Sequence, residues 1–158
     1  MRRQSDLAAT VLSDISTLGA DVSKLTSEVN SFDGGLIASL GVITAETALD
    51  VQILKTTATV KHSAAFNSTE GQSIVLALAG LITPISDSLT AISDKYETFK
   101  KAFESLIVLF DLKVLKAHTD DLISALSEKV PAADATLLES GSSIIDKAFN
   151  STIAIYEG

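Results

Sequence analysis

The chain has 158 residues, which is typical of one compact domain and long enough to bury a substantial core without disulfides or a metal. Hydrophobic residues make up 46% and charged residues 20%, a balance that excludes intrinsic disorder of the whole chain. No cysteine is present, which excludes disulfide scaffolds, thiol chemistry and cysteine-based zinc sites. The net charge of −8 argues against nucleic acid and anionic membranes as partners, since both favour basic surfaces.

Helical periodicity runs along the chain and predicts five helices, at about residues 5–30, 35–62, 70–95, 98–130 and 131–156. Ser5 is the expected N-cap of the first helix, and Asp33-Gly34-Gly35 ends it, because glycine adopts the left-handed conformation that helix ends require. Thr69-Glu70-Gly71-Gln72 has the spacing of a capping box and opens the third helix. Short connections predict antiparallel neighbours, so the expected fold is an all-α, antiparallel five-helix bundle in one domain, residues 1–158.

The second and fourth predicted helices each carry two apolar faces. In the second helix, one face holds Leu36, Leu40, Ile43, Thr47, Val51, Leu54 and Ala58, and the opposite face holds Val42, Ala45, Leu49, Ile53 and Val60. In the fourth, a short face holds Phe103, Leu106, Ile107, Phe110 and Val114, and a longer one holds Val108, Leu112, Leu115, Thr119, Leu122 and Leu126. A helix that is apolar on opposite faces has to be covered on both. We therefore expect the second helix at the centre of the bundle.

No catalytic or metal-binding pattern is found. The sequence has no glycine-rich phosphate loop, no serine nucleophile elbow and no His-Glu-x-x-His helix, so we expect neither an enzyme nor a cofactor. His118 lies beside an apolar stripe, which favours a partly buried histidine at a helix interface over a ligand or base. Asp120 and Asp121 point about 100° apart on a helix, which favours a solvated face over a metal pair.

Three threonines stand where the apolar stripes would place leucine, namely Thr47, Thr119 and Thr152. Each hydroxyl can donate to the carbonyl one turn back, as threonine in helices often does. Alternatively, the hydroxyls point into a cavity, since a ligand pocket is typically apolar with a few placed polar groups. The first interpretation is favoured for any single residue, and the second stays open.

A set of short segments, in order along the chain, carries a resemblance to a known family. The segments are Asp21-Val22-Ser23-Lys24-Leu25, Val29-Asn30-Ser31-Phe32, Ser73-Ile74-Val75, Leu81-Ile82-Thr83-Pro84, Leu122-Ile123-Ser124-Ala125-Leu126, Lys129-Val130-Pro131 and Ala148-Phe149 to Ala154-Ile155-Tyr156. With them, the chain resembles the fungal hydrophobic-surface-binding protein A family, and within it the lipid-binding domain of Mp1-type cell-wall mannoproteins. No single segment is diagnostic, but the ordered set covers nearly the whole chain.

The resemblance implies a secreted or cell-wall protein in which five helices enclose an apolar tunnel that takes up long-chain fatty acids of the arachidonic or palmitic type. It also implies a virulence factor and a glycoprotein, and sequons are present at Asn67 and Asn150. Burying ~14 methylenes at about 0.8 kcal/mol each gives roughly 11 kcal/mol before association costs, which leaves micromolar affinity attainable. We expect a monomer with no nucleic-acid partner and no transmembrane span.

A tunnel between the second, fourth and fifth helices would have ten residues near its wall: Leu40, Thr47, Val51, Gln52, Phe110, Leu115, Thr119, Leu122, Ile145 and Phe149. Gln52 is the expected head-group partner, because its amide can donate to a carboxylate from the edge between the two faces of its helix. The rival hypothesis is a surface-active module. In that hypothesis the helices open and spread their apolar faces on a hydrophobic surface or a partner protein.

Overall fold

The computed structural model describes residues 6–158, and every regular element within that range is a helix. The helices are α1 (Ala8–Asn30), α2 (Leu36–His62), α3 (Ser68–Asp94), α4 (Tyr96–Lys101), α5 (Ser105–Lys129) and α6 (Ala132–Glu157). The all-α prediction is confirmed over this range, and the ends of α2, α3 and α6 lie within two residues of the predicted ones. The predicted number of helices is wrong, because the helix expected at residues 98–130 is two helices.

The break between α4 and α5 is a helix end that the sequence pattern does not predict. The backbone N–H of Phe103 donates to the Lys100 carbonyl at 3.1 Å, and that of Glu104 donates to the Phe99 carbonyl at 2.8 Å. These two bonds form a Schellman motif, whose left-handed position is usually glycine. Here Phe103 occupies it with a φ of +63°. Without a glycine or proline at residues 102–104, the pattern predicts an uninterrupted helix.

The predicted glycine end of the first helix and the predicted capping box of the third both need correction. α1 ends at Asn30 with a right-handed Ser31 as its C-cap, and Gly34 adopts its φ of +93° three residues later, within the connection to α2. The capping box of α3 begins two residues earlier than predicted. The Asn67 side chain accepts from the Glu70 backbone N–H at 2.9 Å, and the Glu70 side chain accepts from the Asn67 N–H at 2.9 Å. Ser5, the expected N-cap of the first helix, lies outside the described residues.

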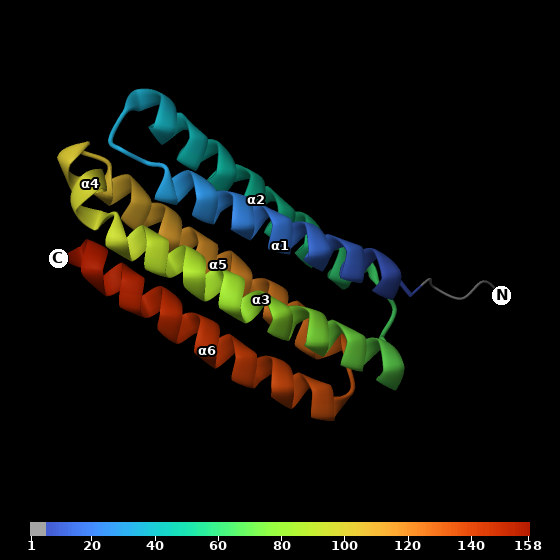
Figure 1. Cartoon of the computed structure of the whole chain (residues 1–158). Coiled ribbons are helices and arrows are strands. Elements are labelled where there is room, and N and C mark those ends of the chain that lie inside the picture. The colour runs from blue at the N-terminus through green and yellow to red at the C-terminus, as the bar shows by residue number, and fades with distance from the viewer. Residues whose placement is uncertain (1–5) are drawn as a thin grey trace.

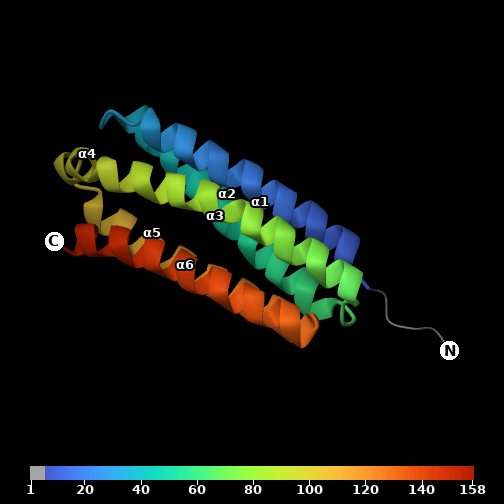
Figure 2. The same ribbon diagram turned by 60° about the horizontal axis from the view of Figure 1, so that its bottom comes forward.

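The five long helices form a closed ring in the order α1–α2–α5–α6–α3, and α4 joins α3 to α5 at one end (Figures 1 and 2). Consecutive long helices alternate in direction, but ring neighbours do not always do so (Figure 1). The α1–α2 and α5–α6 pairs are antiparallel, whereas α2–α5, α3–α6 and α1–α3 are parallel. The prediction of antiparallel neighbours therefore holds for two of the five pairs, because the connections before α3 and before α5 cross the ends of the ring.

The ring also corrects the expected place of α2, which packs against α1 and α5 and is not central. Its Val42, Ala45, Leu49, Ile53 and Val60 face is buried as part of the core. The opposite apolar face is open to solvent, with Leu36 at 77% and Val51 at 58% exposure. By length and composition alone, α2 and α3 are long and apolar enough to cross a membrane. Core helices of soluble proteins meet the same criterion.

Buried aromatic side chains pack at both ends of the ring. At the α4 end, Phe32 stacks on Phe99 with 4.3 Å between ring centroids, and the Tyr156 hydroxyl donates to the Ile92 carbonyl at 2.6 Å. At the other end, the connection between α2 and α3 is held across the ring by the Phe66 N–H, which donates to the Lys129 carbonyl at 2.8 Å. Phe66 is itself buried, so buried aromatic residues pack at this end of the ring as well.

Candidate internal lipid-binding cavity

A ring of five helices has more space at its centre than a ring of four. At a usual spacing of about 9 Å between neighbouring axes, five axes lie roughly 7.7 Å from the centre, against roughly 6.4 Å for four. Leucine-sized side chains that meet across a four-helix core leave a gap along the axis of a five-helix core. The closed ring therefore creates an elongated internal space as a consequence of helix number alone.

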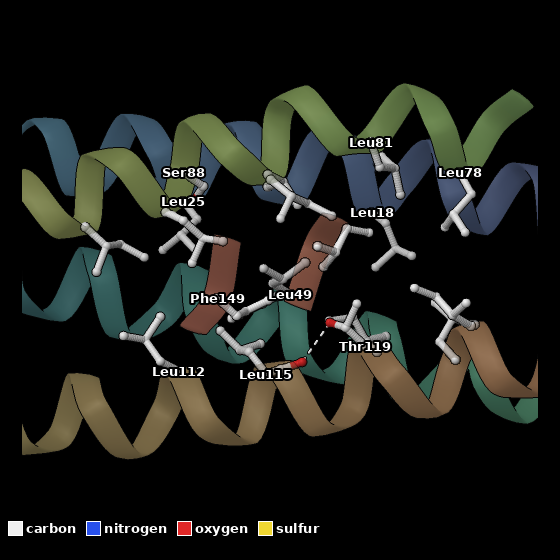
Figure 3. A pocket seen from close by; sticks show the side chains of 18 residues that line it. Leu18, Leu25, Leu49, Leu78, Leu81, Ser88, Leu112, Leu115, Thr119 and Phe149 are labelled. Carbon is white, nitrogen blue, oxygen red and sulfur yellow. Dashed lines mark hydrogen bonds between the residues drawn. The ribbon is translucent and has the colours of Figure 1, made fainter. Parts of the chain in front are cut away.

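That space is an apolar cavity with a wall built by all five long helices (Figure 3). Eighteen residues line it: Leu18, Val22, Leu25, Leu49, Ile53, Leu78, Leu81, Ile85, Ser88, Leu89, Ile92, Leu112, Leu115, Thr119, Leu122, Ile123, Ile145 and Phe149. The lining on α3 runs from Leu78 to Ile92, which corresponds to about 21 Å of helix. This length is comparable with that of an extended long-chain fatty acid.

The cavity is narrow. The space unfilled by atoms between the lining side chains is about 650 Å³, counted with the solvent it meets at its edge. Only a small part of it is wide enough for a water molecule. A lipid chain would therefore occupy the cavity by turning leucine and isoleucine side chains aside, as occurs when a ligand shifts a protein between closely related conformations.

Two of the lining residues are polar, and they differ in their hydrogen bonds. The Thr119 hydroxyl donates to the Leu115 carbonyl at 2.7 Å, the dashed line in Figure 3. The Ser88 hydroxyl is buried and has no hydrogen-bond partner within the described part of the chain. None of the lining residues carries a charge. The wall therefore suits an apolar chain and offers one free hydroxyl.

The structure brings together half of the residues predicted for the tunnel wall. Leu115, Thr119, Leu122, Ile145 and Phe149 all line the cavity. Their contact with a lipid remains a prediction.

The other five predicted wall residues lie outside the cavity. Val51 is 58% exposed, Phe110 67% and Leu40 55%, and Thr47 is also exposed, because all four belong to the outward faces of α2 and α5. Gln52 is half-buried, and its side-chain amide donates to the Thr56 hydroxyl at 3.2 Å within α2. The structure therefore corrects the predicted wall at these five positions, which do not line the cavity.

Half of the cavity wall comes from helices that the sequence reasoning did not assign to it. α1 supplies three lining residues and α3 supplies six, including Leu25, Leu78 and Ser88. Their apolar stripes are visible in the sequence, but a stripe does not say whether it faces solid core or open space. Ser88 is visible only as a polar residue three positions after Ile85 in the stripe of α3.

The other polar residues singled out in the sequence are satisfied by protein groups. Thr47 donates to the Ile43 carbonyl at 2.9 Å, so the local interpretation is confirmed for it as for Thr119. Thr152 instead donates across to the Leu89 carbonyl of α3 at 3.3 Å. His118 Nδ1 lies 2.6 Å from Asp50 Oδ1, which confirms a partly buried histidine at the interface of α5 and α2.

Two pairs of carboxyl groups lie at helix interfaces outside the cavity. Burial, a hydrogen bond with Asp111 and the charge of Asp111 raise the pKa of Glu46 from 4.5 to about 9, in the interface of α2 and α5. Burial and the neighbouring Asp146 of α6 raise the pKa of Asp120 to about 7. The predicted solvated face therefore holds for Asp121, which is exposed, and not for Asp120. Within residues 6–158, no group of three or more histidine or acidic side chains is arranged to hold a metal ion.

The fold and the cavity define a class of protein, namely a closed helical bundle with an apolar internal space. The model of the family described as hydrophobic surface binding protein A matches residues 8–128, and the chain belongs to this family. No curated protein matches the chain in sequence.

Solved structures with the same fold are known. The chain is similar to the crystal structure of AfMP4p in complex with palmitic acid, with a TM-score of 0.93 and 38% identity over 94% of this chain and 99% of that one. It is also similar to ligand binding domain 2 of the Penicillium marneffei MP1 protein complexed with multiple arachidonic acids, with a TM-score of 0.85 and 21% identity over 99% of both chains. Ligand binding domain 1 of the same protein, complexed with arachidonic acids, has a TM-score of 0.85 and 18% identity over 98% of this chain and 99% of that one. At these lower identities, the likeness to the two MP1 domains shows the fold alone.

Proposed function

We propose that this protein binds a long-chain fatty acid in the internal cavity and acts by sequestering it, without catalysis. The observation that carries the proposal is the cavity itself, which is about 21 Å long on α3 and lined by uncharged residues. A complex of palmitic acid with AfMP4p, which shares the fold and 38% of the sequence, supports the same ligand class. Membership of the family favours a secreted or cell-wall location, as the sequence resemblance also implies.

Affinity in such a cavity comes from removing methylene groups from water, at about 0.8 kcal/mol each. It should therefore depend steeply on chain length up to the length of the cavity. Beyond that length affinity should depend weakly on the identity of the acid, because methylenes that extend past the cavity stay in water and add little. Palmitic and arachidonic acids are both expected to bind.

The experiment is a titration of the delipidated protein with palmitic acid and with octanoic acid, followed by native mass spectrometry. Palmitic acid should give a complex of stoichiometric mass and bind at least about 100-fold more tightly than octanoic acid, because the shorter acid buries eight fewer methylenes. Arachidonic acid should bind within about tenfold of palmitic acid. Equal affinities for the long and the short acid, or no complex with either, would contradict the proposal.

Adsorption to hydrophobic surfaces is a second candidate function, and the exposed apolar side of the α2–α5 pair favours it. We call this side the outer apolar surface; its residues are Leu36, Ile37, Leu40, Ile43, Val51, Leu54, Phe103, Leu106, Ile107 and Phe110, each at least 43% exposed. Ordinary soluble monomers seldom expose contiguous apolar surface on this scale without a use for it. Phe103 is 91% exposed and sits in a left-handed conformation, a strained arrangement of the kind found at functional positions.

If the outer apolar surface mediates adsorption, a variant of that surface should lose adsorption and keep lipid uptake. The triple variant Leu40→Gln, Phe103→Asn, Phe110→Gln removes exposed apolar area, and asparagine tolerates the conformation of residue 103. We expect adsorption to polystyrene beads to fall several-fold while palmitic acid affinity stays within about twofold, because no substituted residue lines the cavity. Adsorption equal to that of the unmodified protein would exclude the outer apolar surface as the adhesive face.

A further inference from the structure

Ser88 is an exception among the buried hydroxyl groups of the described helices. Twelve serine and threonine side chains in the helices donate to the backbone carbonyl one turn back. Ser88 is only 4% exposed, yet its Oγ has no hydrogen-bond partner within the described residues. A buried hydroxyl without a partner loses its bonds to water and gains nothing in return. In the empty protein, alanine would suit this position better than serine.

The position of Ser88 links this unpaired hydroxyl to the cavity. Ser88 lies on the cavity wall one helical turn before Ile92, in the same part of the wall as Leu25 (Figure 3). The other hydroxyl of the wall, on Thr119, already donates its proton to the Leu115 carbonyl. Ser88 therefore carries the one hydroxyl proton on the described cavity wall that remains free for a molecule inside.

The chemistry of the wall limits which molecule can use that proton. No lysine, arginine or histidine lines the cavity, so an ionised carboxylate placed beside Ser88 would lose its hydration without a counter-charge. An uncharged polar group has no such penalty, and one hydroxyl can both donate to it and accept from it.

We propose that the Ser88 hydroxyl hydrogen-bonds to the uncharged polar end of the bound lipid, a carboxylic acid or an alcohol. This inference rests on the proposed function and adds the residue and the atom that recognise the ligand's polar end. It replaces Gln52, whose amide is engaged within α2, as the partner of the head group.

The test compares two ligands that differ by one hydroxyl, 1-hexadecanol and hexadecane, by displacement of the fluorescent probe 1-aminoanthracene. Ser88→Ala should lower the affinity for hexadecanol about 5- to 10-fold, the effect of one hydrogen bond, and leave the affinity for hexadecane unchanged. Ser88→Thr keeps the hydroxyl and should bind hexadecanol within about twofold of the unmodified protein. Thr119→Val is the matched control on the same wall, and it should leave the hexadecanol-to-hexadecane affinity ratio unchanged because its hydroxyl is already used.

Urea unfolding of the ligand-free Ser88→Ala variant separates recognition from structure. The variant should be at least as stable as the unmodified protein, since it loses an unpaired buried hydroxyl. Unchanged hexadecanol affinity in Ser88→Ala, or equal weakening of both ligands, would overturn the role of Ser88 while leaving lipid uptake in place. Failure of the unmodified protein to bind palmitic acid or either probe ligand would instead overturn the proposed function.

Discussion

Leu49→Trp is expected to abolish most fatty-acid binding, and Val51→Trp is expected to leave it intact. The two positions are two residues apart on α2 and face opposite ways. Leu49 is 7% exposed and lines the cavity, whereas Val51 is 58% exposed on the outer apolar surface. An indole at position 49 would fill space that two to three methylenes of the ligand need, a loss of about 2 kcal/mol or roughly 30-fold in affinity. The measurement is titration with palmitic acid.

Two further measurements guard against misfolding as an explanation, circular dichroism of Leu49→Trp and binding by a third variant, Leu49→Ala. Overpacking a solid core costs typically about 1–3 kcal/mol, but a position beside unfilled space tolerates added volume better, so Leu49→Trp should retain its helical circular dichroism. Leu49→Ala enlarges the cavity instead and should keep palmitic acid binding despite losing about 2–5 kcal/mol of stability. Binding that survives in Leu49→Trp and disappears in Val51→Trp would move the lipid site to the outer apolar surface.

Glu46→Gln is expected to flatten the dependence of stability on pH. Burial, the hydrogen bond with Asp111 and the charge of Asp111 raise the pKa of Glu46 to about 9, against 4.5 as its ordinary value. Between these two values, the folded protein holds a proton that the unfolded chain has released. The free energy of unfolding therefore falls as the pH rises through this window, and the full stability is present only below about pH 4.5.

The effect on stability is large enough to measure. The free energy of unfolding at pH 7 should be lower than at pH 4.5 by on the order of 3 kcal/mol, because each pH unit in this window changes it by about 1.4 kcal/mol. The pKa of Asp120, raised to about 7 by burial and Asp146, changes stability in the same direction between about pH 4 and 7. A glutamine at position 46 stays neutral and can donate to Asp111 as the protonated acid does. Most of the pH dependence of stability that comes from Glu46 should therefore disappear.

Urea unfolding at pH 5, 7 and 8.5 provides the measurement. The unmodified protein should lose stability steadily over this range, and Glu46→Gln should lose markedly less. Glu139→Gln, at an exposed position of α6, is the matched control and should follow the unmodified protein. The same pH slope in Glu46→Gln and in the unmodified protein would show that Glu46 does not carry a buried proton.

The cavity wall shows where sequence reasoning reached its limit. The inward residues Leu115, Thr119, Leu122, Ile145 and Phe149 were identified because they continue apolar stripes. The same reasoning placed four residues of the outward faces of α2 and α5 beside them, because those faces are equally apolar. A stripe reports which residues share a face of a helix, and it carries no information on which neighbour covers that face.

The sequence by itself determined the helical class, the ends of most helices and the absence of a recognisable catalytic pattern, because these depend on residues close together in the chain. Only the tertiary structure decided the ring order α1–α2–α5–α6–α3, and with it which face of α2 turns inward. The turn at Phe103 was hidden because a phenylalanine, 91% exposed, occupies the left-handed position where local preference would place glycine. The unpaired hydroxyl of Ser88 depends on five helices meeting around one axis, which no local pattern in the sequence can specify.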